Sequence, residues 1–248
     1  ASRLLRTLAH AVLTAGERSG GLVDATLVGE LELAGYRTSR AGQPGLWPAE
    51  LAFDDAARHP ARPRPDRPWS RIGVDDEGRT ITRPPGLRID SGGLGKGLAA
   101  DLVANTLSAH PAFAVDCAGD VRIGGTAGVV RRVLVADPAG PEPLHELEIV
   151  DGAVATSGIT RRSWRSASGT AAHHLLDPST GLPAWTGVIQ ATALAPTALE
   201  AEILAKAALL SGPRRGRALL LHGGLLVFDD GSVDLISRDD RELAAQPA

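Results

Sequence analysis

The sequence feature that most constrains the fold is a series of strand-like segments that follow one another with no helix between them. These β-patterned segments cover residues 113–116, 129–136, 145–150, 153–156 and 188–195. Strands joined by short connections pair antiparallel, whereas parallel strands need a crossover of a dozen or more residues. We therefore predict an α+β fold, with mixed or antiparallel sheets and packed helices, rather than an alternating βαβ fold.

Helices are predicted on both sides of this β-rich region, because apolar residues recur there at helical spacing. The first begins near the N-terminus, the second ends before Pro111, and the third follows Pro196 with Thr197 as its N-cap. The predicted helices cover residues 2–16, 98–107 and 198–210.

Two strand predictions and one loop complete the expected organisation. A short strand over 87–90 leads into the second helix, and a terminal hairpin joins 225–228 to 233–236. Residues 42–68 contain six prolines, which favours a surface loop over regular structure. We predict one domain over the whole 248-residue chain.

Composition and charge exclude several classes of function. The formal net charge is −3 and basic residues are not interleaved with aromatic ones, which argues against a nucleic-acid partner. The single cysteine, Cys117, excludes an internal disulfide and a multi-cysteine zinc site. No apolar run approaches the length of about 18 residues that predicts a transmembrane segment. The chain begins at Ala1 without an initiator methionine or a signal-peptide pattern, as in a processed or trimmed product, so no compartment is predicted.

The lysines are unusually few. Of the 26 basic residues, only Lys96 and Lys206 are lysines, and such an arginine bias reflects genomic base composition. A lysine kept against that bias indicates a need for a compact ammonium group, with chance placement as the alternative.

A glycine-rich loop spans residues 90–97, between the short strand and the second helix. Glycines, a lysine and a helix N-terminus together favour phosphate binding. The Walker pattern fails, because it would need glycine at Asp90 and Ser or Thr at Gly97. A dinucleotide fingerprint fits only weakly over residues 95–100 with Asp116 as its acidic partner. The remaining alternative is a helix N-terminus packed tightly on a sheet.

Two further segments carry polar groups suited to a nucleotide. Ser157 and Gly158 end a strand in a turn that can hold a phosphate or ribose, although many strand ends look like this. In 173–181, adjacent histidines on an extended chain point to opposite faces, so at most one of them faces a given cleft. Such a histidine either takes a proton from an attacking hydroxyl or binds a diphosphate. The remaining alternative is a structural histidine whose hydrogen bonds are made within a sheet.

The third predicted helix carries Glu202 and Lys206 four residues apart. A surface ion pair worth a few tenths of a kcal/mol is the ordinary interpretation of that spacing. A helical wheel, however, puts both residues within the apolar arc, between Leu199 and Leu209. Charges in such a place are normally paired or part of a site, so we predict a site.

Taken in order, these segments resemble the FAD:protein FMN transferase family, the ApbE-like flavin transferases, over essentially the whole chain. The matching segments are 21–26, 90–97, 156–158, 173–181 and 195–202, with a looser match at 115–120. The resemblance implies an enzyme that cleaves FAD, releases AMP and joins FMN to a threonine of an acceptor flavoprotein, with Mg²⁺ as a cofactor. It also implies that many members act outside the cytoplasm.

The resemblance assigns roles to residues of this chain. It places His174 as the base and Gly93, Glu202 and Lys206 at the metal site. The positions that it places against FAD are Ala34, Gly35, Tyr36, Asp90, Lys96, Ser157, Gly158, His173, Leu175 and Asp177.

This chain departs from the family pattern at several positions. Family members typically carry Asp, then Thr or Ser four residues later, where Glu202 and Lys206 stand here. An ammonium does not ligate Mg²⁺ but can take the place of the cation. Asp116 and Ala118 replace residues that are usually Asn and Gly, and Ala34 replaces a common Trp. The family's N-terminal strand, with its Met-Gly-Thr motif, has no counterpart after Ala1.

Three hypotheses remain from the sequence. The first is a flavin transferase that uses FAD with an altered metal dependence. The second is a non-catalytic flavin-binding homologue with a lost or altered Mg²⁺ site, and the third is a Rossmann-type oxidoreductase.

Overall fold

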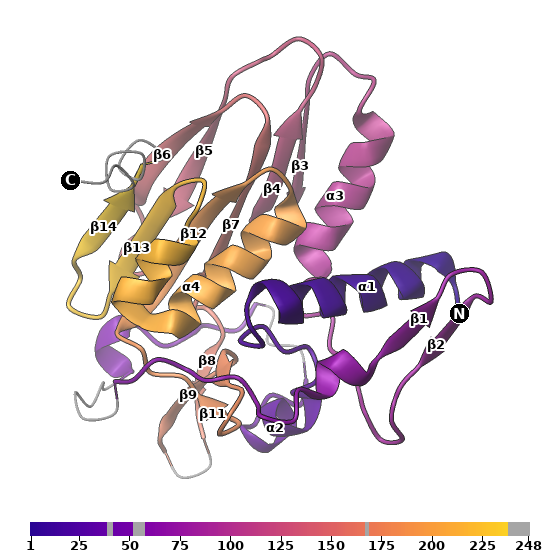
Figure 1. Ribbon diagram of the computed structural model, residues 1–248. Coiled ribbons are helices and arrows are strands. Elements are labelled where there is room, and N and C mark those ends of the chain that lie inside the picture. The colour runs from indigo at the N-terminus through magenta and orange to yellow at the C-terminus, as the bar shows by residue number, and fades with distance from the viewer. Residues whose placement is uncertain (39–41, 52–57, 167–168, 238–248) are drawn as a thin grey trace, which may run out of the picture.

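One antiparallel sheet forms the centre of the fold. The computed structural model describes residues 1–38, 42–51, 58–166 and 169–237. Within these residues, six strands form a sheet in the order β14-β13-β12-β7-β4-β3, with every neighbouring pair antiparallel. These strands are β3 (Phe113–Cys117), β4 (Asp120–Gly124), β7 (Gly152–Gly158), β12 (Val188–Ala195), β13 (Gly224–Phe228) and β14 (Val233–Ile236). The α+β prediction is confirmed (Figure 1), and a Rossmann-type fold is excluded because it needs parallel strands.

Two helices cover one face of this sheet (Figure 1). Helix α3 (Gly95–Leu107) packs on β3 and β4, and α4 (Ala198–Leu219) packs on β7 and β12. The contact side chains of β12 and α4 are largely alanines, which are buried and small, so the helix lies close to the sheet. They include Ala191, Ala193, Ala195, Ala201, Ala205 and Ala208.

The N-terminus of α4 is held by two capping groups. The Thr197 side chain accepts a hydrogen bond of 3.2 Å from the Glu200 amide, so the predicted N-cap is confirmed. Asp101 of α3 accepts hydrogen bonds from the amides of Ala198 and Leu199, at 2.8 and 2.9 Å. A carboxylate is favourable at the positive end of the helix dipole, and here it also fixes α4 against α3.

A separate hairpin packs on the opposite face of the sheet. It is formed by β5 (Arg131–Ala136) and β6 (Pro143–Ile149). Because side chains alternate along a strand, Val154 of β7 faces away from α4 while its alanine neighbours face the helix. Val154 clusters with Ile123 of β4 and Ile149 of β6, which attaches the hairpin to the sheet.

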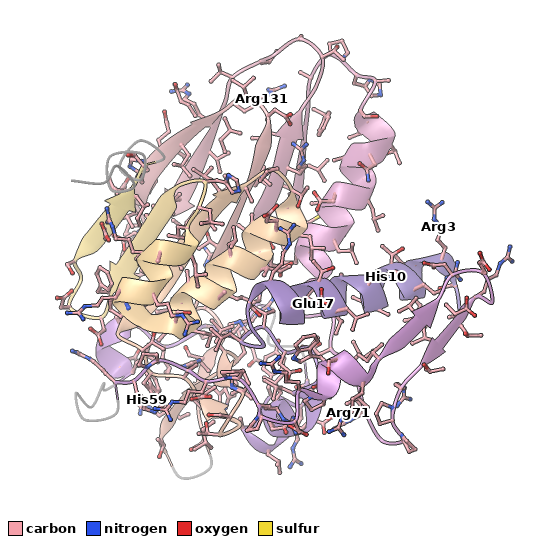
Figure 2. The ribbon with its side chains drawn as sticks, viewed as in Figure 1. Arg3, His10, Glu17, His59, Arg71 and Arg131 are labelled. Atoms are coloured by element: carbon pink, nitrogen blue, oxygen red, sulfur yellow. The ribbon has the colours of Figure 1, made fainter. Side chains whose placement is uncertain are left out.

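Helix α1 (Arg3–Arg18) forms a second, smaller core at one end of α3 and α4. Its buried face carries Ala9, Val12 and Ala15 at helical spacing, and it packs beside the short helix η3 (Pro68–Arg71) and the hairpin of β1 (Gly73–Asp75) and β2 (Thr80–Thr82). Ser2 caps the helix by accepting from the Leu5 amide. Arg3, His10 and Glu17 are exposed on α1, as expected for an amphipathic helix (Figure 2).

Several short elements lie below α4 (Figure 1). They are α2 (Val28–Leu33), η1 (Pro48–Glu50), β8 (Ser163–Arg165), β9 (Ala171–His173), β10 (Leu176–Asp177) and β11 (Leu182–Pro183). In the predicted loop 42–68, the described residues contain η1 and the start of η3 and are otherwise irregular, while 52–57 lie outside the described residues.

Two predicted elements differ from the structure. The strand predicted over 87–90 is wrong, since no described strand pairs with it; the Asp90 amide instead bonds the Ala25 carbonyl at 2.8 Å. Helix α4 continues past residue 210 to Leu219, across a kink at Gly212, where φ is 74°, followed by Pro213. In the described part of the chain, no helix is both long and apolar enough to cross a membrane.

Candidate functional site

The glycine-rich loop turns the chain sharply into α3. Asp90 begins the turn, because its carboxylate accepts a hydrogen bond of 2.9 Å from the Gly92 amide. At Gly97 an added Cβ would lie 2.5 Å from the Ala198 carbonyl oxygen, so only glycine lets the start of α3 meet the start of α4. The tight packing considered from the sequence is therefore present, but against α4 rather than against a sheet.

The Glu202–Lys206 pair lies inside this helix–helix contact. Glu202 is 0% exposed and Lys206 9% exposed, which confirms their predicted place within the apolar arc of α4. Glu202 Oε1 lies 3.0 Å from Lys206 Nζ, and Glu202 Oε2 accepts the Gly97 amide at 2.9 Å. Both oxygens of this carboxylate are thus engaged.

The second lysine forms a matching pair. Lys96 Nζ lies 2.8 Å from Oδ1 of Asp120, which begins β4 and is 1% exposed. Asp120 Oδ2 is buried and has no partner among the described residues. Burial raises the pKa of Asp120, and the nearby charge of Glu202 raises it further, while Lys96 lowers it.

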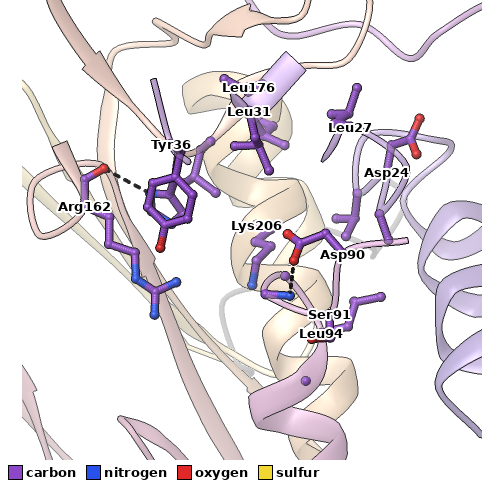
Figure 3. Close-up of a pocket in the computed structure, with 18 of the residues that line it drawn as sticks. Asp24, Leu27, Leu31, Tyr36, Asp90, Ser91, Leu94, Arg162, Leu176 and Lys206 are labelled. Atoms are coloured by element: carbon purple, nitrogen blue, oxygen red, sulfur yellow. Dashed lines mark hydrogen bonds between the residues drawn. The ribbon is translucent and has the colours of Figure 1, made fainter. Parts of the chain in front are cut away.

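A first cavity of about 580 Å³ opens beside the glycine-rich loop (Figure 3). Its apolar lining includes Leu22, Val23, Leu27, Leu31, Leu175 and Leu176. Tyr36 lines it as well, and the Tyr36 ring lies 5.7 Å from that of Trp164 between centroids. Asp24 and Asp90 supply its carboxylates. Such a mixture suits a ring system that carries a few hydrogen-bonding groups.

A second cavity of about 490 Å³ lies on the other side of Lys206 and is more polar. Its lining includes Thr156, Ser157 and Gly158 at the end of β7, together with Asp137 and Gln190. Gln190 is held by a hydrogen bond from its Nε2 to the Ala136 carbonyl at 2.9 Å. This cavity therefore offers hydroxyl, amide and carboxylate groups beside apolar side chains such as Trp47 and Leu134.

Five residues line both cavities, and we call them the shared wall: Gly92, Lys96, Arg162, His174 and Lys206. Three of them carry positively charged groups. Figure 3 shows Lys206 extending from α4 between Arg162 on one side and Asp90 on the other. A wall with three cations between a more apolar and a more polar cavity suits an anionic group that links two dissimilar halves of one ligand.

The two histidines lie on opposite sides of the chain, as predicted. His174 lines both cavities, and burial lowers its pKa well below the ordinary value, so the imidazole is neutral. Its Nδ1 lies 3.3 Å from the Arg162 carbonyl. Since a carbonyl only accepts, Nδ1 carries the hydrogen and Nε2 keeps the lone pair. A neutral imidazole of this kind can take up a proton.

His173 instead belongs to the core. It is 0% exposed, its Nε2 lies 3.1 Å from the Ala184 carbonyl, and its ring packs edge-on against Trp185. Burial lowers the pKa of His173 to about 3. His173 is therefore a core histidine whose ring is hydrogen-bonded inside the fold, which was the alternative to a role in the cleft.

Some residues that the resemblance places against FAD line neither cavity in the part of the chain that the structure describes. The Ala34 carbonyl accepts a hydrogen bond of 2.9 Å from Trp164 Nε1, and Gly35 packs against the same indole, so they position Tyr36. Asp177 is buried in a turn, where its Oδ1 accepts from the amides of Arg62 and Ser179. Its role in the structure is to shape the loop that follows the histidines.

Three further residues of the site were not singled out from the sequence. Asp120 and Arg162 complete the charged groups, and they lie within or just after segments that resemble the family. Asp24 lies in the matching segment 21–26, and its Oδ2 is buried and has no partner among the described residues. Burial raises the pKa of Asp24, while hydrogen bonds from Thr26 lower it. A buried, half-satisfied carboxylate beside a cavity is a marker of a site.

The residues predicted to hold Mg²⁺ do not fit that ion. Mg²⁺ prefers six oxygen ligands in octahedral geometry, and an ammonium has no lone pair to offer. Lys206 Nζ lies 3.0 Å from Glu202, and the Lys206 chain packs against Gly93, the third predicted position. Among the described residues, no group of three or more His, Cys, Asp or Glu side chains is arranged to hold a metal ion.

Known proteins share the sequence profile and the fold of this chain. The sequence profile described as the ApbE family matches residues 1–227. The chain is similar to the ApbE protein of Thermotoga maritima, whose crystal structure superposes with a TM-score of 0.74 at 27% identity, covering 99% of this chain and 79% of that one.

Two curated relatives are named FAD:protein FMN transferase. The protein of Treponema pallidum (strain Nichols) is 31% identical over 169 residues, which are 60% of this chain and 46% of its own length. That of Salmonella typhimurium is 25% identical over 233 residues, which are 92% of this chain and 65% of its own length. The chain thus spans about half of the first relative and about two thirds of the second.

Proposed function

This chain belongs to the ApbE family, and we propose that it binds FAD across the two cavities and transfers FMN from FAD to a threonine of an acceptor protein. The observation that carries the proposal is the shared wall, where Lys96, Arg162 and Lys206 lie between a more apolar cavity and a more polar one. FAD has the matching form, since a diphosphate joins two ring-bearing halves.

The sizes and linings of the cavities support a dinucleotide. Each volume lies within the roughly 300–1,000 Å³ that is typical of small-molecule sites. One ring system of FAD would lie against Tyr36 and the leucines of the first cavity. The other half would lie in the second cavity, where Ser157 and Gln190 offer partners for ribose and base atoms. The diphosphate would then meet the cations of the shared wall.

The transfer reaction needs positioning, positive charge and a base. The threonine oxygen of the acceptor forms a bond to the phosphorus of the FMN half, and the bond from that phosphorus to the bridging oxygen breaks. AMP leaves with the bridging oxygen, and the hydroxyl proton passes to the base. His174 is the candidate base, because it is neutral and lines both cavities. Lys96, Arg162 and Lys206 stabilise the negative charge that develops on the phosphate oxygens.

One incubation tests this function. Purified protein is mixed with FAD and a threonine-containing acceptor peptide, once with Mg²⁺ and once with EDTA, and the peptide is analysed by mass spectrometry. We expect a peptide carrying FMN and an equal amount of free AMP. Bound FAD without adduct or AMP in either buffer would reject the transferase.

A non-catalytic flavin-binding protein is the second candidate. Lys206 favours it, because an ammonium stabilises a bound diphosphate but does not polarise a phosphoryl group as a divalent ion does. Under this alternative FAD binds and stays intact. If FAD does not bind at all, both candidates fail.

A further inference from the structure

The only two lysines of the chain meet at the shared wall, and each is anchored by a buried carboxylate. Lys96 is paired with Asp120 at 2.8 Å and Lys206 with Glu202 at 3.0 Å. The anchors come from β4 and α4 and the lysines from α3 and α4, so three elements of the fold converge on the pairs. This arrangement holds two ammonium groups at fixed positions next to both cavities.

Each ammonium retains hydrogen-bonding capacity. A lysine has three N–H donors, and one of them on each lysine is directed to its carboxylate. The remaining donors of Lys206 belong to an ammonium that borders both cavities, so they can reach an anion lying across the shared wall. The carboxylates thus orient the lysines without saturating them.

The same carboxylates leave no room for a divalent ion. Both oxygens of Glu202 are occupied, by Lys206 and by the Gly97 amide. Asp120 Oδ2 has no partner in the described part of the chain, but it is buried, so a hydrated Mg²⁺ has no access to it. A cation adjacent to Glu202 is therefore already supplied by the protein.

We propose that Lys206 is the resident cation of the diphosphate site, so that this chain binds FAD without a divalent metal. The inference rests on the proposed function in taking FAD as the ligand, and it adds that the affinity for FAD depends on Lys206 instead of Mg²⁺. The matching lysine, Lys96, supplies a second fixed ammonium on the same wall.

A purely structural role for the Glu202–Lys206 pair predicts a different effect on FAD binding. If Lys206 served only to neutralise Glu202, then removing both charges together would leave FAD binding intact. A buried ion pair can often be replaced by uncharged residues of similar volume without loss of stability. The double variant Glu202→Gln/Lys206→Met therefore separates the two roles without leaving an unpaired buried charge.

The experiment measures the dissociation constant for FAD by equilibrium dialysis, in EDTA and in millimolar Mg²⁺. For the wild-type protein we expect the two constants to agree within about threefold. For Glu202→Gln/Lys206→Met we expect binding to weaken by about tenfold or more in both buffers, because a desolvated charge contact to the diphosphate is lost and no metal ligand is gained.

The single variant Lys206→Thr tests the same position in a different way, because it should make FAD binding dependent on Mg²⁺. It removes the ammonium, frees Glu202 Oε1 and adds a hydroxyl oxygen, which creates two oxygen ligands for a cation. We expect weak FAD binding in EDTA and at least about tenfold tighter binding when Mg²⁺ is added. Circular dichroism melts of all variants verify that they are folded.

The outcomes distinguish the inference from the function on which it rests. Wild-type binding that needs Mg²⁺, or a double variant that binds FAD as tightly as the wild type in EDTA, would overturn the resident cation while leaving FAD as the ligand. Absence of FAD binding by the folded wild-type protein in both buffers would instead overturn the proposed function.

Discussion

The amide N–H of Gly97, in the first turn of α3, donates a hydrogen bond of 2.9 Å to Oε2 of Glu202 on α4. This bond joins the glycine-rich loop to the helix that carries Lys206, although the two residues are 105 positions apart in the chain. The geometry of the loop and the position of the ammonium therefore depend on each other.

Replacing Gly97 by alanine should destabilise the protein and disturb the site. The added Cβ would lie 2.5 Å from the backbone oxygen of Ala198, which cannot rotate away. We expect a loss of about 2 kcal/mol in unfolding free energy, measured by urea denaturation, as for other overpacked contacts. Gly95→Ala is the matched control, because its Cβ would meet Ser91 at an ordinary 3.5 Å. An equal loss in both variants would show that the helix contact is not the cause.

His173 should make the fold sensitive to acid. Its pKa is about 3 in the folded protein because of burial, against 6.5 for an exposed histidine. The unfolded chain therefore binds more protons, and stability that is present above pH 6.5 is lost as the pH falls toward 3. Between pH 7 and 5 this costs about 2 kcal/mol of unfolding free energy.

The measurement compares urea unfolding of wild type and His173→Gln at both pH values. We expect the loss between pH 7 and 5 to be smaller in the variant by about that 2 kcal/mol. His174 acts in the same direction, but it is present in both proteins and does not affect the difference. Parallel pH profiles would contradict the assignment.

Under the proposed function, His174→Ala should slow the transfer of FMN much more than it weakens FAD binding. If His174 is the base, then kcat falls by about 10²–10⁴-fold, while the FAD dissociation constant changes less than about tenfold. His10→Ala, on the exposed face of α1, is the control and should leave both unchanged. A kcat for His174→Ala within a few-fold of wild type would exclude it as the base.

Ala118→Gly should stabilise the protein. Ala118 has φ of +54° in the turn between β3 and β4, and a left-handed non-glycine residue costs roughly 1–2 kcal/mol. Glycine removes that strain but makes the unfolded chain more flexible, at a cost of about 0.4–1 kcal/mol. The net expectation is a gain of about 0.5–1 kcal/mol, measured by urea denaturation.

The matched control for this prediction is Ala99→Gly, on the exposed side of α3. There the backbone is helical, so glycine brings only its flexibility and should cost about 1 kcal/mol. The two alanine-to-glycine changes are thus expected to have opposite signs. A loss of stability in both would mean that Ala118 is not strained.

The elements with strong local signals were predicted well from the sequence. Strand β12 has the predicted bounds, because Gly187 and Pro196 bracket an uninterrupted strand-forming run. Thr197 caps α4 as predicted, since N-cap chemistry is local. The two- and three-residue strands β8 to β11 were not predicted, because their pairing exists only once distant segments have met. The segment 87–90 has a strand-like composition but pairs with no other strand among the residues that the structure describes.

The same distinction applies to the residues of the site: some carry a local sequence signal, and others are brought there only by the fold. Lys96 and Lys206 stood out because lysine is rare in this sequence, whereas His174 was assigned by the family resemblance; all three line the shared wall. Asp120 and Arg162 carry no such local signal, and only the sheet and the β8 region bring them to the lysines. His173 and Asp177 were assigned by resemblance to a segment, whereas their side chains contact the interior of the fold.

The scarcity of lysine gives this site a chemical property of its own. Apart from the N-terminus, Lys96 and Lys206 are the only primary amines in the sequence. An amine-directed acylating reagent therefore has side-chain targets at the shared wall and nowhere else. Whatever anion rests there should shield both amines together, so occupancy can be read as lost acylation without labelling the ligand.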